Sequence, residues 1–147
     1  MVQKMKKNNK GFVILFAVTI AAILLAVALG VSNIALKEVN FSTSAKDTNN
    51  AFFAADTGLE YVLFRDKPPV SSYPTPAAGT STTFPPVILY GLGTGGFNCV
   101  IVTVTKNNIT PPVRTTIISK GYNRGGDNAS CTSSSINRIE REIKVSY

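Results

Sequence analysis

Residues 7–33 read KNNKGFVILFAVTIAAILLAVALGVSN, and their composition changes abruptly at Phe12. From Phe12 to Val31 the only polar side chain is Thr19. At a helical rise of about 1.5 Å per residue this run spans about 30 Å, which is the thickness of the hydrocarbon core of a bilayer. The remaining soluble part, about 115 residues, is too small to surround a helix that is apolar on every side. The run therefore predicts a membrane-spanning helix over 12–31.

The flanks of the apolar run set its orientation and separate it from a cleavable secretory signal. The apolar middle of such a signal is roughly 7 to 15 residues long and ends at a small-residue cleavage site, whereas this run is longer and has no such site behind it. Four lysines precede the run, while the first charges after it are the opposed neighbours Lys37 and Glu38. The positive-inside rule then places the N-terminus in the cytoplasm. We expect a single-pass cell membrane protein with an extracytoplasmic head.

The positive charge of the chain is concentrated before the apolar run. The formal net charge is +7, but Lys4, Lys6, Lys7 and Lys10 supply four of these charges, and the remaining 11 basic and 8 acidic residues leave a net charge of +3. A nucleic-acid surface gathers Lys and Arg on one face together with stacking aromatic residues. The balance of charges in the head gives no strong case for such a surface, so nucleic acid is disfavoured as a partner.

The helix has no sequence signal that would end it at Val31. No proline occurs between Val31 and Pro68, and Gly58 is the only glycine there. Apolar residues recur in this stretch at spacings of roughly three and four, which predicts an amphipathic continuation over 32–66. The segment FSTSAKDTNN, 41–50, is rich in Ser, Thr and Asn, which are poor helix formers, so it is a candidate for a local break.

A second region follows the helix. Residues 67–86 are dense in Pro, Ser and Thr and predict a loop. Residues 87–147 contain β-branched or aromatic runs separated by Gly, Pro and Asn, which predict an antiparallel sheet of about four strands; the runs are PVILYG, FNCVIVTVT, TTIISKGY and INRIEREIKVSY. In the last run mainly apolar and charged positions alternate, so one face needs an apolar cover, and the amphipathic helix can supply it.

These patterns together predict an α+β fold, in which a long N-terminal membrane-spanning helix precedes a small antiparallel β-sheet head. The expected organisation is a basic leader over 1–11, the membrane helix over 12–31, the amphipathic continuation over 32–66, the loop over 67–86 and the β-rich head over 87–147.

The sequence offers little support for catalysis. It contains no histidine, which removes His-based triads, His metal sites and the commonest general base, and it has no G-x-S-x-G motif. GLGTGG, 91–96, matches G-x-G-x-x-G, but a strand-like run follows it where a dinucleotide site needs a helix, so a hairpin turn is favoured. Glu140 and Glu142 share a face with Arg138 and Lys144, which favours cross-strand salt pairs. We expect no enzyme activity, no cofactor and no metal site.

Cys99 and Cys131 are the only cysteines, and both lie in the part that is predicted to be outside, where disulfides form and persist. Two thiols in a chain without histidine are too few for a metal site, and a disulfide is favoured over free thiols. Three N-x-Ser/Thr sequons begin at Asn40, Asn108 and Asn128. They carry little weight because such short patterns often arise by chance.

The N-terminal part of the chain resembles a known family. A short basic leader that ends in Gly11, an immediate Phe12 and an apolar helix that continues into an amphipathic half resemble the type IV pilins and the related pseudopilins. AFFAADTGLEYVLF, 51–64, is similar to the Ala-Ala-acidic segment of the PilX-like minor pilins; the matching positions are Ala54, Ala55, Asp56, Gly58, Leu59 and Glu60. The resemblance covers about residues 4–64, and the head has only general similarity.

The resemblance implies processing and assembly. In that family a prepilin peptidase cuts after the glycine and methylates the new N-terminus, which here makes Phe12 the first residue of the mature protein. Gly11 has no side chain to crowd the scissile bond. The membrane, the peptidase and other pilin-like subunits are then the partners, and the helices associate through a heterologous interface that does not close, so a helical filament forms. Phe16 and Thr19 are the candidate assembly positions.

One position departs from the family pattern. Most pilins carry a glutamate as the fifth mature residue, which is thought to pair with the N-terminal amine of a neighbouring subunit, and here that residue is Phe16. A carboxylate within the bilayer is costly and is kept mainly for function. Its absence favours a minor subunit, at the tip of a filament or in its priming, over a major one.

Two functions remain open at this point. The first is a pilin-like structural subunit of a type IV pilus or of a secretion or DNA-uptake pseudopilus, which would become part of a filament at the cell surface. The alternative is an unprocessed, single-pass membrane-anchored binding module whose head recognises an extracellular ligand through its Pro/Ser/Thr loops.

Overall fold

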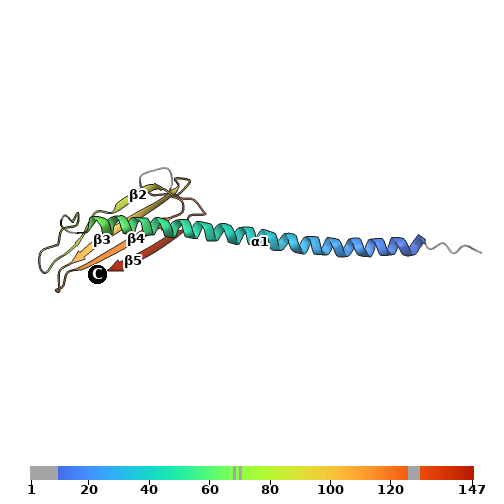
Figure 1. The fold of residues 1–147 in the computed structure, drawn as a ribbon, viewed down its shortest axis with the longest axis horizontal. Helices are drawn as coiled ribbons and strands as arrows, with labels where there is room; N and C mark the ends of the chain where they lie inside the picture. Colours follow the sequence, from blue (N-terminus) through green and yellow to red (C-terminus); the bar gives the residue numbers. More distant parts are fainter. Residues whose placement is uncertain (1–9, 68, 70, 126–129) are drawn as a thin grey trace, which may run out of the picture. The chain divides into compact units, whose positions relative to one another are not determined.

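The computed structural model describes residues 10–67, 69, 71–125 and 130–147, so the predicted leader lies almost wholly outside the described residues. Two compact units are present, Met1–Thr43 and Ser44–Tyr147. The described residues form one long helix and five strands (Figure 1); these are α1 Lys10–Arg65, β1 Ser81–Thr83, β2 Val87–Leu92, β3 Asn98–Asn107, β4 Arg114–Tyr122 and β5 Glu140–Ser146. The α+β class predicted from the sequence is confirmed.

Helix α1 continues through residues 41–50, where the sequence suggested a local break. The intrinsic penalty of Ser, Thr or Asn in a helix is below about 0.7 kcal/mol per residue, which is too small to end a helix that continues on both sides. Thr43 Oγ1 also donates a hydrogen bond to the carbonyl oxygen of Val39 at 2.9 Å, so its hydroxyl is satisfied within the helix. The suggested break is therefore wrong.

The sheet of the second unit is antiparallel and has the order β1-β3-β4-β5, with β2 also paired to β3. β4 lies along one edge of β3, while β1 and β2 share the other edge, β1 beside residues 105–107 and β2 beside residues 98–102. The two prolines at 85–86 separate β1 from β2 because proline has no N–H to donate to the ladder. β1 lies inside the stretch that was expected to be a loop, so the head has one strand more than the sequence indicated.

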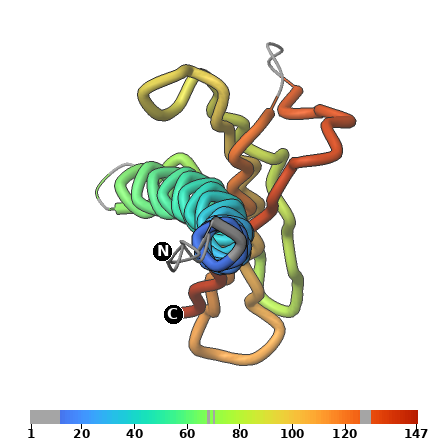
Figure 2. The backbone as a smooth tube through the Cα atoms, turned by 90° about the vertical axis from the view of Figure 1, so that its right-hand side faces the viewer, coloured from blue at the N-terminus to red at the C-terminus, as the bar shows by residue number. Residues whose placement is uncertain are grey.

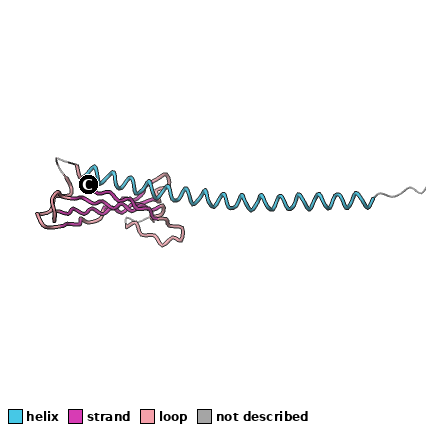
Figure 3. Tube along the Cα trace, turned by 90° about the horizontal axis from the view of Figure 1, so that it is seen from below, coloured by secondary structure: helices cyan, strands magenta, loops and turns pink. Residues whose placement is uncertain are grey.

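The core of the second unit lies between α1 and one face of the sheet. Val100, Val102 and Val104 alternate along β3 and are fully buried, as the period of two in a strand requires. Leu59 and Val62 of α1 pack against them, and Figures 2 and 3 show the sheet beside this part of the helix. Each buried side chain of this kind contributes roughly 1.5 to 3 kcal/mol. The amphipathic half of the helix is the cover that the sheet was expected to need.

Small residues let α1 approach the sheet closely. Ala51 and Ala55 are fully buried, and a Cβ placed on Gly121 of β4 would overlap the Ala51 carbonyl oxygen and the Ala55 backbone. Ser119 Oγ, also buried, donates a hydrogen bond of 2.6 Å to the carbonyl oxygen of Ala55. Only glycine fits at position 121, because the neighbouring atoms belong to the helix backbone and cannot rotate away.

The last strand follows its predicted alternation in part. Ile143 and Val145 are half-buried and pack against the core. Glu140 and Glu142 are exposed, and both form ion pairs with Lys120 Nζ of β4, at 3.1 Å and 3.5 Å. The predicted cross-strand salt pairs are confirmed, with Lys120 as their shared cation.

Candidate functional site

The helix of the first unit is apolar on all sides over 12–31. Every residue from 12 to 43 is exposed, including Phe12 at 75% and Phe16 at 57%. Among the described residues, α1 is the one helix that is long and apolar enough to cross a membrane. In water exposed apolar surface is unfavourable by roughly 25 cal/mol per Å², so this helix is compatible with a single membrane span.

The predicted processing and assembly positions lie at the start of α1. Among the described residues α1 starts at Lys10, so the bond between Gly11 and Phe12 lies within the helix. Thr19 Oγ1 donates a hydrogen bond of 2.8 Å to the carbonyl oxygen of Phe16. The hydroxyl proton of Thr19 is therefore donated within the helix, and the predicted assembly role of Phe16 and Thr19 stays a prediction.

The segment 51–64 packs α1 onto the sheet. Ala54 and Ala55 are buried, and a Cβ on Gly58 would come within 2.6 Å of the Val100 side chain. These small residues form the face that packs on the sheet, whereas Glu60 is exposed on the helix surface. Close packing of the helix on the sheet thus explains the Ala-Ala-x-x-Gly spacing.

A buried ion pair fastens the end of α1 to the sheet. Asp66, directly after the helix, accepts from Lys106 Nζ of β3 at 2.6 Å, and their side chains are 4% and 9% exposed. Ser71 Oγ donates to the same carboxylate oxygen, and the Tyr147 hydroxyl donates to the other one, each at 2.6 Å. These four residues are called the Asp66 cluster below. The sequence carried one signal for it, because Lys106 continues the inward row of valines on β3 and a buried lysine needs a partner.

The Asp66 cluster holds its charges in fixed protonation states. Burial alone would raise the pKa of Asp66, but hydrogen bonds from Lys106, Ser71 and Tyr147 outweigh it and bring the pKa below its ordinary value. Burial, together with the bond to Asp66, raises the pKa of Tyr147 to about 12. Asp66 therefore stays ionised and Tyr147 stays a neutral donor near pH 7. These fixed protonation states suit a contact that stabilises the fold and not a proton-transfer site.

An open surface pocket of about 540 Å³ lies beside the Asp66 cluster. Its lining is mostly apolar and consists of Glu60, Leu63, Phe64, Asp66, Lys67 and Tyr147. Phe64 is 75% exposed among the described residues. The pocket can accept an apolar group, but no nucleophile with an adjacent base lines it.

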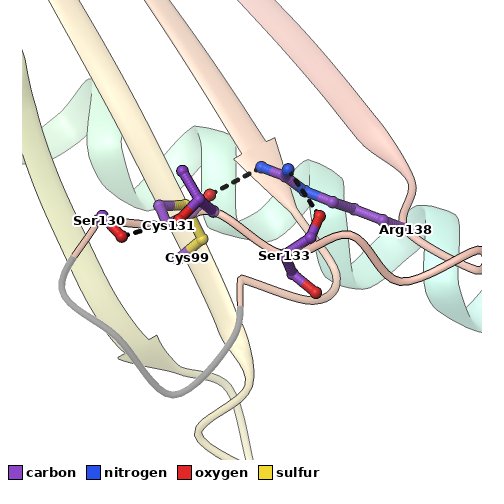
Figure 4. The surroundings of a disulfide bond; sticks show 6 residues. Cys99, Ser130, Cys131, Ser133 and Arg138 are labelled. Carbon is purple, nitrogen blue, oxygen red and sulfur yellow. Dashed lines mark hydrogen bonds between the residues drawn. A yellow bond between two sulfur atoms is a disulfide. The ribbon is translucent and has the colours of Figure 1, made fainter.

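The predicted disulfide is present on the opposite face of the sheet. Cys99 of β3 is bonded to Cys131, with Cα atoms 5.8 Å apart, and both are buried. Arg138 donates hydrogen bonds to the carbonyl oxygens of Cys131 and Ser133 at 2.8 Å and 3.2 Å (Figure 4), and its guanidinium lies 3.8 Å from the centre of the Tyr122 ring. The disulfide and the arginine together hold the segment before β5 over this face.

Two further sequence interpretations meet the structure here. GLGTGG links β2 to β3 in an antiparallel hairpin, with Gly93 and Gly96 at positive φ, so the predicted turn is confirmed. Of the sequon asparagines, Asn108 donates a hydrogen bond of 2.8 Å from its side-chain amide to the Pro76 carbonyl oxygen. Asn128 lies outside the described residues.

The chain matches no protein-family model, no curated protein and no solved structure. Its function must therefore be inferred from its own residues. Of these, the apolar run 12–31 is the most informative, because its large apolar side chains are exposed on every side of the helix.

Proposed function

We propose that the chain is a pilin-like structural subunit of a type IV pilus or a related secretion or DNA-uptake pseudopilus. The observation that carries the proposal is a helix that is apolar and exposed on every side over 12–31 and belongs to a chain with a folded, disulfide-bonded β head. Such a helix can be satisfied first by lipid and later by the helices of other subunits. A domain that stays in water would gain nothing from exposing such a helix, because exposed apolar surface is unfavourable there.

The subunit is a minor one, at the tip or in priming. Phe16 occupies the place of the glutamate that most pilins carry, so no carboxylate is available there to meet the amine of a neighbour. Its side chain can still pack against apolar groups. A subunit at the tip loses little by this, because no further subunit needs to lie above it.

The proposed topology places the N-terminus in the cytoplasm and the head outside. The lysines before the run favour this orientation. The disulfide also fits an extracytoplasmic head, since such bonds persist in oxidising compartments. A structural role with no catalytic function agrees with the Asp66 cluster, whose charges are already neutralised within the fold.

Sequencing the N-terminus of the mature protein tests the proposal. In cells with a working prepilin peptidase the chain should begin at Phe12, and Gly11→Val should block cleavage by crowding the scissile bond. Gly30→Val is the matched control, since a Cβ at Gly30 has no atom within 4 Å. An intact Met1 on the wild-type protein would overturn the proposal and leave the membrane-anchored binding module.

A further inference from the structure

Strand β5 leaves one edge of the sheet unpaired among the residues that the structure describes. Thr115 and Tyr147 exchange both backbone hydrogen bonds, at 2.7 Å and 3.0 Å, so Tyr147 directs its backbone groups toward β4. Hydrogen-bonding direction alternates along a strand. The even-numbered residues therefore direct their N–H and C=O groups to the free edge, and all of them are exposed; they are Glu140, Glu142, Lys144 and Ser146.

Within residues 140–146, one antiparallel alignment brings opposite charges together without setting any like charges opposite each other. Two copies of β5 must pair even-numbered residues with even-numbered residues, because only these have free backbone groups. An alignment centred on Ile143 pairs all of residues 140–146. It sets Glu142 opposite Lys144 twice, once on each side of the centre.

The neighbouring alignments each create a repulsive pair. A centre at residue 142 sets Glu142 opposite itself, and a centre at residue 144 sets Lys144 opposite itself. A centre at residue 141 sets Glu140 opposite Glu142. Like charges directly opposite each other destabilise a sheet, so the alignment centred on Ile143 is favoured over these three.

We propose that a second copy of this chain pairs along β5, antiparallel and centred on Ile143. Among the described residues, Lys144 has no carboxylate within 4.0 Å, so it can receive Glu142 of the second copy. Lys120 keeps its closer partner Glu140 at 3.1 Å when Glu142 turns away. Ile143 is only half-buried at this edge, and its counterpart in the second copy covers it.

The pairing also fixes the relative direction of the two heads. The end of α1 and the end of β5 meet where Tyr147 donates to Asp66, and Arg141 near the start of β5 reaches Thr48 at 3.5 Å. Helix residues 48–65 thus run in the same direction as β5. In an antiparallel pair these helix segments of the two heads run in opposite directions.

Cysteine cross-linking of the full chain in detergent micelles tests the pairing. Ile143→Cys places two thiols directly opposite each other, whereas Val145→Cys, equally half-buried on the same face, meets Arg141 of the other copy. Oxidation should give a disulfide-linked dimer of the first variant in large excess over the second. Equal yields overturn the proposal, and mean that the charges of β5 serve only to keep the edge free.

Charge exchange provides a test without cysteine. Glu142→Lys and Lys144→Glu each replace two attractive pairs by two repulsive ones and should weaken the dimer roughly tenfold in a sedimentation measurement. The double variant Glu142→Lys/Lys144→Glu restores opposite charges and should restore the dimer. Failure of this rescue, with heads that unfold at the wild-type temperature, overturns the proposal. Association through residues 12–31 is unaffected by either exchange, so these results are independent of the proposed filament role.

Discussion

Residues 12–43 and 44–65 belong to one helix, yet different interactions stabilise them. Every residue of the first stretch is exposed, whereas Ala51, Ala55 and Val62 of the second stretch have no exposed surface. The second stretch finds its apolar partner in the sheet of its own chain. The apolar run 12–31 in the first stretch has no such partner among the described residues. The helix therefore packs against its own chain only after residue 43, where the two compact units divide.

The largest expected effect comes from the Asp66 cluster, which joins the end of the second stretch to the sheet. Asp66→Ala would leave Lys106 buried without a counter-charge, which should lower the free energy of unfolding of the head by about 3 to 5 kcal/mol. Asp56→Ala, a change of the same residue type within α1, removes no ion pair among the described residues and serves as the control. Thermal unfolding of the full chain in detergent measures both variants. Equal losses would contradict the role given to Lys106.

The same cluster predicts a pH dependence. The pKa of Asp66 is lowered in the folded head, so the folded state binds a proton less readily than the unfolded state does. The stabilisation is then complete above the ordinary pKa of aspartate, about 4, and is lost as the pH falls through the lower folded value. The difference in unfolding free energy between the wild type and Asp66→Asn should shrink over that range. A difference that stays constant there would exclude this linkage.

The disulfide should stabilise the head and leave the first stretch unchanged. It joins residues 32 positions apart, and in the chain-entropy model its loss costs about 3 to 4 kcal/mol. The double variant Cys99→Ser/Cys131→Ser should lower the unfolding temperature of the head. The helical signal of residues 12–43, which lie outside the closed loop, should persist in micelles above that temperature. Joint melting of both parts would show that they are not independent.

Substitution of a glycine should have different effects on stability in the packed head and in the exposed first stretch. Gly121→Val would force a side chain into the backbone of α1 at Ala51 and Ala55, and should cost the head about 3 kcal/mol. Gly30→Val introduces the same side chain in the exposed stretch, where no atom lies within 4 Å. Unfolding of the head should respond to the first substitution and not to the second. A stable Gly121→Val head would mean that the helix does not lie as close to β4 as described.

The sequence predicted the helix and four of the five strands because each rests on a local pattern, and it predicted the disulfide because Cys99 and Cys131 are the only cysteines and lie in the part expected to be outside. Apolar runs, alternation in strands and the glycines of the β2–β3 turn act over a few residues. Strand β1 was missed because its three residues have no pattern of their own and depend on the free edge of β3. The suggested break at 41–50 was wrong because weak propensities do not end a helix that is continuous on both sides.

The Asp66 cluster was beyond sequence reasoning for a different reason. Its ion pair joins residues 40 positions apart, and the last tyrosine of the described chain joins it from 81 positions away. Alternation along β3 could have indicated that Lys106 is inward, but only the fold shows which carboxylate reaches it. Gly121 was likewise unremarkable until α1 was placed over it.

The smallest expected effect concerns lysines on opposite faces of the sheet. Lys106→Met removes the buried partner of Asp66, whereas Lys120→Met removes a cation whose side chain is 43% exposed and whose carboxylates are also in water. Exposed ion pairs gain little over hydration and are screened by salt. The unfolding temperature should therefore fall for Lys106→Met and stay within error for Lys120→Met, at low and at high salt. A marked, salt-sensitive fall in the unfolding temperature of Lys120→Met would show that the outer face of β4 and β5 contributes to stability as the inner face does. Burial would then not explain the difference between the two ion pairs.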